Sequence, residues 1–404
     1  MPNVKPQDIK PFARIKVIGV GGSGSNAVDH MINSKVTGVE YVTMNTDTQD
    51  LHASKAQTKI HIGRNLTKGL GSGMNPEVGR QSAEETKAEI QEALKGSDMV
   101  FLACGMGGGT GTGASPIVAR LAREMGILTV GVVTKPFFFE GNQRMSHAEQ
   151  GIRELEKEVD ALIVIPNDRL ITITEEDTSF KDAFKMCDEI LLEAVKGISE
   201  LITTQGMINI DYADILTILQ NAGSAFMGIG FASGDDRARE SALAAINSPL
   251  LDIVIDGAKG VLFAISGTSD LKMSEVHEIA KIVTESIDPH AKVVFGAIED
   301  ADMKKGEIKV TVIATGFDGT RQRSSQKNLT SATANQKSNP EKLTPNEDES
   351  KNKEKDRPQS DERQSDHDTE TRVIVDDVSD DANIDLDDDW SSVPAFLRRK
   401  STKE

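Results

Sequence analysis

Short apolar runs alternate with longer amphipathic stretches through the first half of the chain. Strands are expected at the β-like runs Arg14–Val20, Val39–Asn45, Lys59–Gly63, Met99–Cys104, Ile127–Thr134 and Ala161–Ile165. Helices are expected between them, at Asn26–Asn33, Pro76–Leu94, Ser115–Met125 and Met145–Val159. This alternation predicts a doubly wound, mostly parallel α/β sheet that binds its ligand at the carboxyl ends of the strands.

A longer helical pattern follows at Phe180–Thr203. Its apolar positions recur every three or four residues, at Phe184, Cys187, Leu191, Ala194, Ile198 and Leu201. This central helix is predicted to connect two domains. After Gly223 the β-like runs Gly260–Ser266, Ala291–Ala297 and Lys309–Thr315 alternate with helical patterns at Asp236–Asn247 and Ser274–Ser286. They predict a smaller α/β domain that ends near Phe317.

The pattern disappears after residue 317. Asp318–Asp389 has no aromatic residue and few aliphatic ones, so it cannot bury enough surface to offset its ordering entropy and is predicted to be a disordered acidic linker. Residues 390–404 differ again, because an apolar patch there precedes a basic cluster, which is typical of a docking peptide. The residues expected to dock a partner are Trp390, Pro394, Phe396, Leu397, Arg398 and Arg399.

Composition adds limits to this picture. The hydrophobic content of 37% agrees with a chain that is only partly packed, and the net charge of −18 argues against nucleic acid as a partner. Cys104 and Cys187 have no metal-ligand spacing and are expected to be reduced core thiols of a cytosolic protein. Met1–Ala13 lacks the apolar stretch of a signal peptide, and no segment has the apolar length of a membrane span.

The densest glycine cluster follows the expected strand Met99–Cys104. Residues 105–114 contain six glycines. Glycine supplies no core and loses much entropy on folding, so bare backbone must be needed there. A strand, a glycine-rich loop and a helix at Ala114–Met125 aim several N–H groups and a helix N-terminus at one point. This arrangement predicts a phosphate cradle, to which Thr110 and Thr112 add hydroxyl groups.

A second glycine cluster supports a competing interpretation. Gly19–Gly24 fits G-x-G-x-x-G after the first strand, and Asp47 lies near the end of the second, which favours a dinucleotide-dependent oxidoreductase. A third cluster, at Gly69–Gly73, favours a triphosphate instead, and the second half has no obvious hydride-handling residues. A P-loop NTPase is excluded, because G-x-x-x-x-G-K-[ST] does not occur.

Gly107–Gly113 reads GGGTGTG and is similar to the signature of the FtsZ/tubulin family of polymerising GTPases. The resemblance covers nearly all of Arg14–Phe317 and favours the bacterial cell-division branch of the family. It implies bound GTP or GDP, hydrolysis to GDP and phosphate, and an accompanying Mg²⁺ whose ligands the sequence does not name. The expected organisation is a flexible segment at 1–13, a tubulin-like GTP-binding domain at 14–179, the central helix at 180–203, a second domain at 204–317, the linker at 318–389 and the docking peptide at 390–404.

The resemblance also assigns residues to the nucleotide. Those expected to bind GTP are Gly21, Gly22, Ser23, Gly24, Ser25, Asn26, Asn45, Asp47, Gly71, Gly105, Gly107, Gly108, Gly109, Thr110, Gly111, Thr112, Gly113, Thr134, Pro136, Glu140, Arg144, Asn167, Phe184 and Asp188. Glu140 is expected to accept from ribose hydroxyls and Arg144 to approach phosphate. Phe184 offers guanine a stacking face, and the Asp188 carboxylate can accept from N1–H and the 2-amino group.

Asn209-Ile210-Asp211-Tyr212-Ala213-Asp214 matches the family's N-x-D-x-A-D loop. Two carboxylates at the start of a helix can orient a water, so Asn209, Asp211 and Asp214 are the expected catalytic residues, although Asp211 in isolation would be an ordinary N-cap. The central helix rises about 36 Å, which keeps them from their own nucleotide. They are expected to complete the site of the next subunit in a head-to-tail filament.

The resemblance finally implies where the filament works. An FtsA-like membrane-anchoring adaptor and other division regulators are the expected partners of the docking peptide. The expected location is the cytoplasm, with assembly at mid-cell beneath the membrane. Neither a nucleic acid partner nor a direct membrane span is expected.

Overall fold

The computed structural model describes residues 13–171, 179–204, 206–248, 257–300 and 303–317. The predicted N-terminal segment, except for its last residue, and the predicted linker and docking peptide lie outside the described residues. None of the helices within these ranges is long and apolar enough to cross a membrane.

Strands and helices alternate as the sequence predicted. The strands are β1 (Ile15–Val20), β2 (Val39–Asn45), β3 (Thr58–His61), β4 (Met99–Gly105), β5 (Leu128–Lys135), β6 (Ala161–Pro166), β7 (Gly223–Ser233), β8 (Gly260–Gly267), β9 (Lys292–Glu299) and β10 (Glu307–Thr315). The helices are α1 (Gly21–Asn33), α2 (Thr48–Ala53), α3 (Arg64–Thr67), α4 (Pro76–Glu85), α5 (Lys87–Leu94), α6 (Thr110–Glu124), α7 (Asn142–Glu156), α8 (Asn167–Ile171), α9 (Phe180–Thr203), α10 (Tyr212–Leu219), α11 (Arg237–Ile246), α12 (Met273–Glu285) and the short 3₁₀ helix η2 (Phe138–Glu140).

The described strands form one ten-stranded sheet in the order β3-β2-β1-β4-β5-β6-β7-β10-β8-β9. Neighbours from β3 to β7 run parallel, and β10 is antiparallel to both β7 and β8. The first half of the sheet joins the second through a short pairing of Ala161–Ile163 with Gly223–Ala225. The mostly parallel sheet that the sequence predicted is therefore confirmed.

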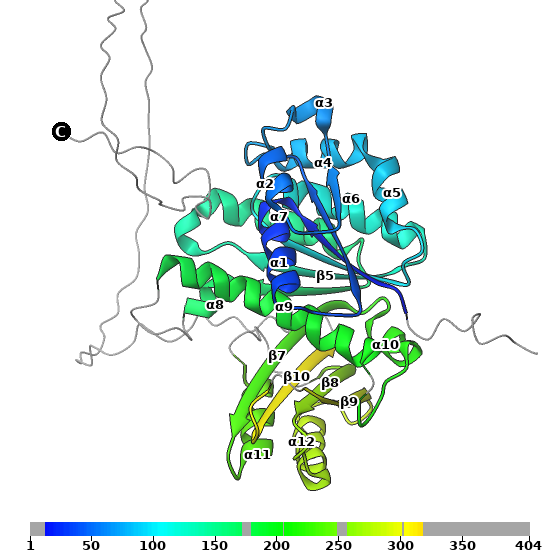
Figure 1. The fold of residues 1–404 in the computed structure, drawn as a ribbon, viewed down its shortest axis with the longest axis vertical. Helices are drawn as coiled ribbons and strands as arrows, with labels where there is room; N and C mark the ends of the chain where they lie inside the picture. Colours follow the sequence, from blue (N-terminus) through cyan, green and yellow to red (C-terminus); the bar gives the residue numbers. More distant parts are fainter. Residues whose placement is uncertain (1–12, 172–178, 205, 249–256, 301–302, 318–404) are drawn as a thin grey trace, which may run out of the picture. The chain divides into compact units, whose positions relative to one another are not determined.

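Apolar side chains cover both faces of the parallel half of the sheet. On one face, Val17 and Phe101 lie in a core with Leu191 of α9. On the other face, Ile18 and Leu102 lie in a core with residues of α5, α6 and α7. Adjacent residues of β1 thus enter different cores, as the alternation of a strand requires. Helices on both faces confirm the doubly wound arrangement (Figure 1).

The central helix α9 occupies the predicted range and is the longest helix in Figure 1. Its apolar positions, such as Leu191 and Ile198, are buried in the core beneath β1 and β5. Leu262 of β8 and Ile313 of β10 belong to the same core. One amphipathic helix therefore packs against strands from both halves of the sheet, which the stripe of apolar residues allows.

The prediction of a single helix at Pro76–Leu94 is wrong. The helix is interrupted at Thr86, which separates α4 from α5. Thr86 has φ −103° and ψ 18°, which is outside the helical region. Its hydroxyl accepts from the N–H of Gly63 at 3.0 Å and donates to the carbonyl of Ser82 at 3.1 Å. The contact with Gly63, which is distant in the sequence, stabilises the bend at Thr86. The local pattern of apolar residues gives no indication of this contact.

Strand β7 was not predicted, because three glycines interrupt its apolar alternation. It pairs with β10 in antiparallel register from Ala225 to Ser233. A Cβ on Gly230 would lie 2.0 Å from the carbonyl oxygen of Ser241 in α11. Glycine there lets a helix approach the sheet closely, so the residue that weakens the strand pattern serves the packing.

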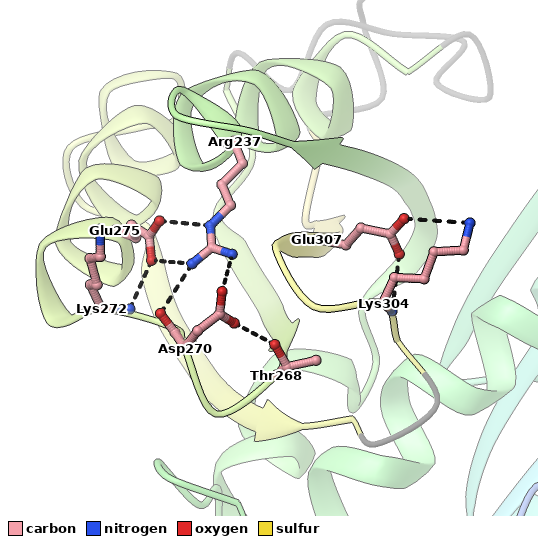
Figure 2. A network of polar contacts seen from close by, with 7 residues as sticks. All are labelled: Arg237, Thr268, Asp270, Lys272, Glu275, Lys304 and Glu307. Carbon is pink, nitrogen blue, oxygen red and sulfur yellow. Dashed lines mark hydrogen bonds and ion pairs between the residues drawn. The ribbon is translucent and has the colours of Figure 1, made fainter.

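A buried arginine joins the two helices of the second half, as Figure 2 shows. Arg237 of α11 donates to both carboxylate oxygens of Glu275 in α12, at 2.7 and 2.9 Å. It also donates to the carboxylate of Asp270 at 2.8 Å and to the Asp270 carbonyl at 3.1 Å. Thr268 donates to the same Asp270 carboxylate. The loop between β8 and α12 is thus tied to the start of α11.

Candidate functional site

Most of the predicted nucleotide residues lie at one edge of the sheet. β2, β1, β4, β5 and β6 are parallel neighbours, so their carboxyl ends meet at that edge. The segments that follow them are Gly21–Asn26 after β1, Asp47 after β2, Gly107–Gly113 after β4, Pro136–Glu140 after β5 and Asn167 after β6. Thr134 and Gly105 are paired in the last part of β5 and β4.

The helices that follow the two glycine loops at this edge are α1 and α6. α1 begins at Gly21 and α6 at Thr110, so the predicted starts at Asn26 and Ser115 are wrong. Gly21 has φ +73°, a conformation that turns the chain from β1 straight into a helix and that only glycine adopts easily. A Cβ on Gly21 would lie 2.9 Å from the backbone nitrogen of Gly111. The two helix N-termini therefore converge, and their N–H groups and positive dipole ends suit an anion.

A cluster of hydroxyl groups joins three of the predicted loops. Thr110 Oγ1 lies 2.6 Å from Thr46 Oγ1 and 2.9 Å from Ser72 Oγ. A Cβ on Gly71 would be 3.8 Å from Asp47 Oδ2. The other carboxylate oxygen of Asp47 caps the first N–H groups of α2. The loops after β2, α3 and β4 thus surround one point.

The turn after β5 forms another wall. Glu140 Oε1 accepts from the N–H of Phe137 at 2.9 Å, and its Oε2 lies 3.1 Å from Arg144 Nη1. A ribose hydroxyl that donates to Glu140 would therefore have to share its carboxylate oxygens with the N–H of Phe137 and with Arg144. A Cβ on Gly107 would lie 2.7 Å from the Arg144 carbonyl, whereas one on Gly108 would meet only Arg144 Nη2, at 4.0 Å. Gly108 thus borders open space.

The predicted base residues on α9 adjoin this turn. The rings of Phe137 and Phe184 meet edge-on, with centroids 5.2 Å apart. Asp188 lies one helical turn further along α9, and burial raises its pKa from 3.8 to about 7. Burial first, and then the charges of Asp188 and Glu140, raise the pKa of the Cys187 thiol. The carboxylates of Asp188 and Glu140 therefore both lie close enough to Cys187 of α9 to influence its pKa.

Some predicted residues carry buried polar atoms for which the described part of the chain supplies no hydrogen-bond partner. These atoms are Ser25 Oγ, Asn45 Nδ2 and Asn167 Oδ1. Asn167, at the start of α8, is only 5% exposed. Buried polar groups are nearly always paired, so donors and acceptors left over at one edge of a sheet indicate a bound polar molecule.

The predicted catalytic residues are exposed on the loop before α10. Asp211 is at the N-cap of α10 but makes no side-chain cap bond, and Asp214 lies in the first turn. Both side chains are exposed. Asn209 instead stabilises the loop, because its Oδ1 accepts from the N–H of Gly206 at 2.7 Å.

This loop lies at the opposite edge of the sheet from the glycine loops. The hydroxyl of Tyr212 donates to the carbonyl of Asp98 at 2.7 Å, immediately before β4 begins. Gly105 ends the same strand at the nucleotide edge. Seven residues of strand separate these points by about 20 Å. The structure therefore does not bring Asp211 and Asp214 to the glycine loops of the same subunit.

Four further residues shape the site although the sequence analysis did not assign them. Thr46 and Ser72 lie inside the recognised loops, and their hydroxyl groups were the signal that could have found them. Phe137 lies inside the segment Thr134–Phe137 that the family resemblance includes, although its contact with Phe184 gives no local signal. Asp168 carried no signal, because its contact is with another element. Asp168 Oδ1 accepts from the N–H of Phe138 at 2.8 Å.

Comparison with known proteins identifies the two halves of the chain. Residues 14–175 match the Tubulin/FtsZ family, GTPase domain, and residues 223–318 match the FtsZ family, C-terminal domain. An FtsZ dimer from M. jannaschii, solved empty, has 42% identity and a TM-score of 0.74 over 78% of this chain and 93% of its own. A tryptophan-to-tyrosine mutant of FtsZ from M. jannaschii has 44% identity and a TM-score of 0.73 over 76% of this chain and 92% of its own.

A more distant structure shares the fold. CetZ2 from Haloferax volcanii, solved as a GTPγS-bound protofilament, has 21% identity and a TM-score of 0.62 over 76% of this chain and 94% of its own. The family matches confirm the GTPase interpretation and displace the oxidoreductase alternative. The chain belongs to the Tubulin/FtsZ family of filament-forming GTPases, with a GTPase domain followed by an FtsZ-type C-terminal domain.

Proposed function

We propose that this GTPase hydrolyses GTP at a site that two adjacent subunits of a head-to-tail filament complete. The hydrogen bond from Tyr212 to the carbonyl of Asp98 carries the proposal, because it holds the Asp211 and Asp214 loop at the edge opposite the glycine loops. Exposed carboxylates at that edge are free to meet a second subunit. The relative from M. jannaschii was solved as a dimer, which supports contact between subunits.

In the proposed site the N-termini of α1 and α6 bind the phosphates. Thr112 Oγ1 accepts from the N–H of Gly107 at 2.9 Å and so keeps the loop closed around them. Guanine lies against Phe184, with Asp188 accepting from its N1–H and 2-amino group. From the next subunit, Asp211 and Asp214 orient a water and accept its proton as it attacks the γ-phosphate. The products are GDP and phosphate, and loss of the γ-phosphate weakens the subunit contact.

Magnesium fits this site as a partner of the nucleotide. The described residues contain no group of three or more His, Cys, Asp and Glu side chains that could hold a metal ion. Mg²⁺ is commonly bound by substrate phosphates, waters and one or two side chains. Phosphate oxygens are therefore proposed as its main ligands, and the hydroxyl cluster around Thr110 as the nearest neutral protein oxygens. The ion would offset phosphate charge.

Complementation between two inactive variants tests the shared site. Asp211→Ala is expected to bind GTP normally and to lose nearly all hydrolysis, whereas Thr110→Arg is expected to lose GTP binding. Mixing them should restore part of the phosphate release, because one variant supplies the nucleotide and the other the carboxylates. Asp235→Ala, which removes another exposed aspartate, is the control and should keep its activity. Normal hydrolysis by Asp211→Ala, or a mixture no more active than its parts, would contradict the proposal.

We further propose that the filament forms the cytokinetic ring of a dividing bacterial cell. The match to the FtsZ-type C-terminal domain supports this role. Residues 390–404, which lie outside the described residues, would dock an FtsA-like membrane adaptor and other division regulators. The filament would then assemble in the cytoplasm at mid-cell, beneath the membrane.

A further inference from the structure

The turn after β5 is held by groups from two other elements. The N–H of Phe138, the first residue of η2, donates to Asp168 Oδ1 at 2.8 Å. Asp168 lies in the first turn of α8, beside Asn167. The ring of Phe137 is 1% exposed and meets Phe184 of α9 edge-on. The turn therefore links the start of α8 to the face of α9 that is proposed to stack on guanine.

We propose that Asp168 is a positioning residue for guanine nucleotide binding. Its carboxylate holds the N–H of Phe138, and this bond adds to that between Glu140 and the N–H of Phe137 in setting the position of Phe137 against the ring of Phe184. Asp168 itself touches no nucleotide in this proposal. The inference rests on the proposed base site, because Phe184 must contact guanine for its position to matter.

The chemistry of the bond favours a decisive role for one carboxylate. A hydrogen bond to an ionised acceptor is about twice as strong as a neutral one. The N–H of Phe138 is at the start of a short helix, where no backbone carbonyl of that helix can accept it. The rings of Phe138 and Phe139 are 71% and 45% exposed, so packing holds the outer side of the turn weakly. Loss of the Asp168 carboxylate would loosen the outer side of the turn, while the bond from the N–H of Phe137 to Glu140 Oε1 remains.

The bond can be removed from either end with a matched control. Asp168→Ala removes the acceptor, whereas Asp168→Asn keeps an amide oxygen that can accept from the same N–H. Phe138→Pro removes the donor, whereas Phe138→Ala loses the same ring and keeps the N–H. Proline suits the first position of a helix, and Phe137, with ψ 154°, has the extended conformation that precedes proline.

Calorimetric titration of the nucleotide-free full chain with GDP tests the proposal. Asp168→Ala and Phe138→Pro are each expected to raise the Kd by about ten-fold, the loss of one hydrogen bond to a charged group. The double variant should be no worse than either single variant, because both remove one bond. Asp168→Asn should raise the Kd by only about three-fold, because a neutral acceptor keeps about half of the bond's free energy, and Phe138→Ala should stay within about two-fold of the wild type. Thermal unfolding of the nucleotide-free variants should stay cooperative, with melting temperatures lowered by no more than a few degrees, because only one hydrogen bond of the folded state is lost.

Phe184→Ala separates this proposal from the base site on which it rests. If that variant binds GDP like the wild type, the base site is wrong and the role of Asp168 is wrong with it. If Phe184→Ala loses affinity while Asp168→Ala and Phe138→Pro do not, the base site stands and the positioning role is overturned. Equal losses in Phe138→Ala and Phe138→Pro, or the loss of a cooperative unfolding transition in Asp168→Ala, would also overturn it.

Discussion

At the scale of single residues, the proposed base site holds one carboxyl group in an unfavourable environment. Burial raises the pKa of Asp188 from 3.8 to about 7. The unfolded chain therefore ionises this group at a lower pH than the folded protein does. Its contribution to the free energy of unfolding is fully present below about pH 4 and is lost as the pH rises to about 7. Guanine, with two donors side by side, is a partner that would stabilise the carboxylate.

Asp188→Asn is expected to separate stability from nucleotide binding. Without nucleotide, the variant should melt at a higher temperature than the wild type at pH 8 and should lack the decline between pH 4 and pH 7 that this group causes. It should nevertheless bind GTP more weakly, and Asp188→Ala should lose about 1–3 kcal/mol of binding free energy. Calorimetry and thermal unfolding across this pH range provide the measurements. An unchanged preference for GTP over ATP in both variants would refute the assignment.

Glycines of the signature Gly107–Gly113 are expected to be of two kinds: those needed for the packing of the fold and those needed for nucleotide binding. A Cβ on Gly113 would lie 1.8 Å from the carbonyl oxygen of Pro76, so Gly113→Ala should force α4 away and destabilise the fold by about 1–3 kcal/mol. A Cβ on Gly108 would meet only Arg144 Nη2, at 4.0 Å. Gly108→Ala should therefore melt like the wild type but bind GTP at least about ten-fold more weakly, because the methyl group enters phosphate space. Denaturant unfolding and GTP titration distinguish the two; equal stability of both variants would contradict this division.

At the scale of elements, buried polar contacts hold the second half together. Arg237, with a side chain 5% exposed, is the only group that binds both Asp270 and Glu275 among the contacts described (Figure 2). Arg237→Met is expected to lower the melting temperature by about 5–10 °C, because two carboxylates lose their shared cation. Lys304→Met, which removes an exposed ion pair with Glu307 in the same region, is the control and should change little. Similar melting temperatures for both variants would show that the buried network contributes no more than a surface pair.

At the scale of the whole molecule, the glycine loops and the Asp211 loop lie at opposite edges of the sheet, which is the basis of the proposed head-to-tail contact. The proposed docking peptide would add a separate function, because its apolar and basic residues follow a long polar segment in the sequence. Deletion of Trp390–Glu404 is expected to leave GTP hydrolysis and filament formation of the purified protein close to normal, while recruitment to a membrane carrying an FtsA-like adaptor is lost. Light scattering with GTP and vesicle sedimentation measure the two effects. Failure of the truncated protein to polymerise would place this segment in the folded core and contradict the prediction.

The sequence by itself determined the fold class and the range of α9, because the periodicities of strands and helices are local properties. It also located the glycine loops, because a run of glycines is visible in the sequence alone. It did not predict β7, whose glycines serve the approach of α11, or the break at Thr86, which a bond to Gly63 holds. The length of α9 had already predicted that Asp211 lies far from the glycine loops, and the tertiary structure places the two at opposite edges of one sheet. Only the tertiary structure decided that Asp168 reaches Phe138 and that Arg237 reaches Glu275. These contacts join residues far apart in the chain, so they depend on the path of the backbone, which no local pattern of side chains contains.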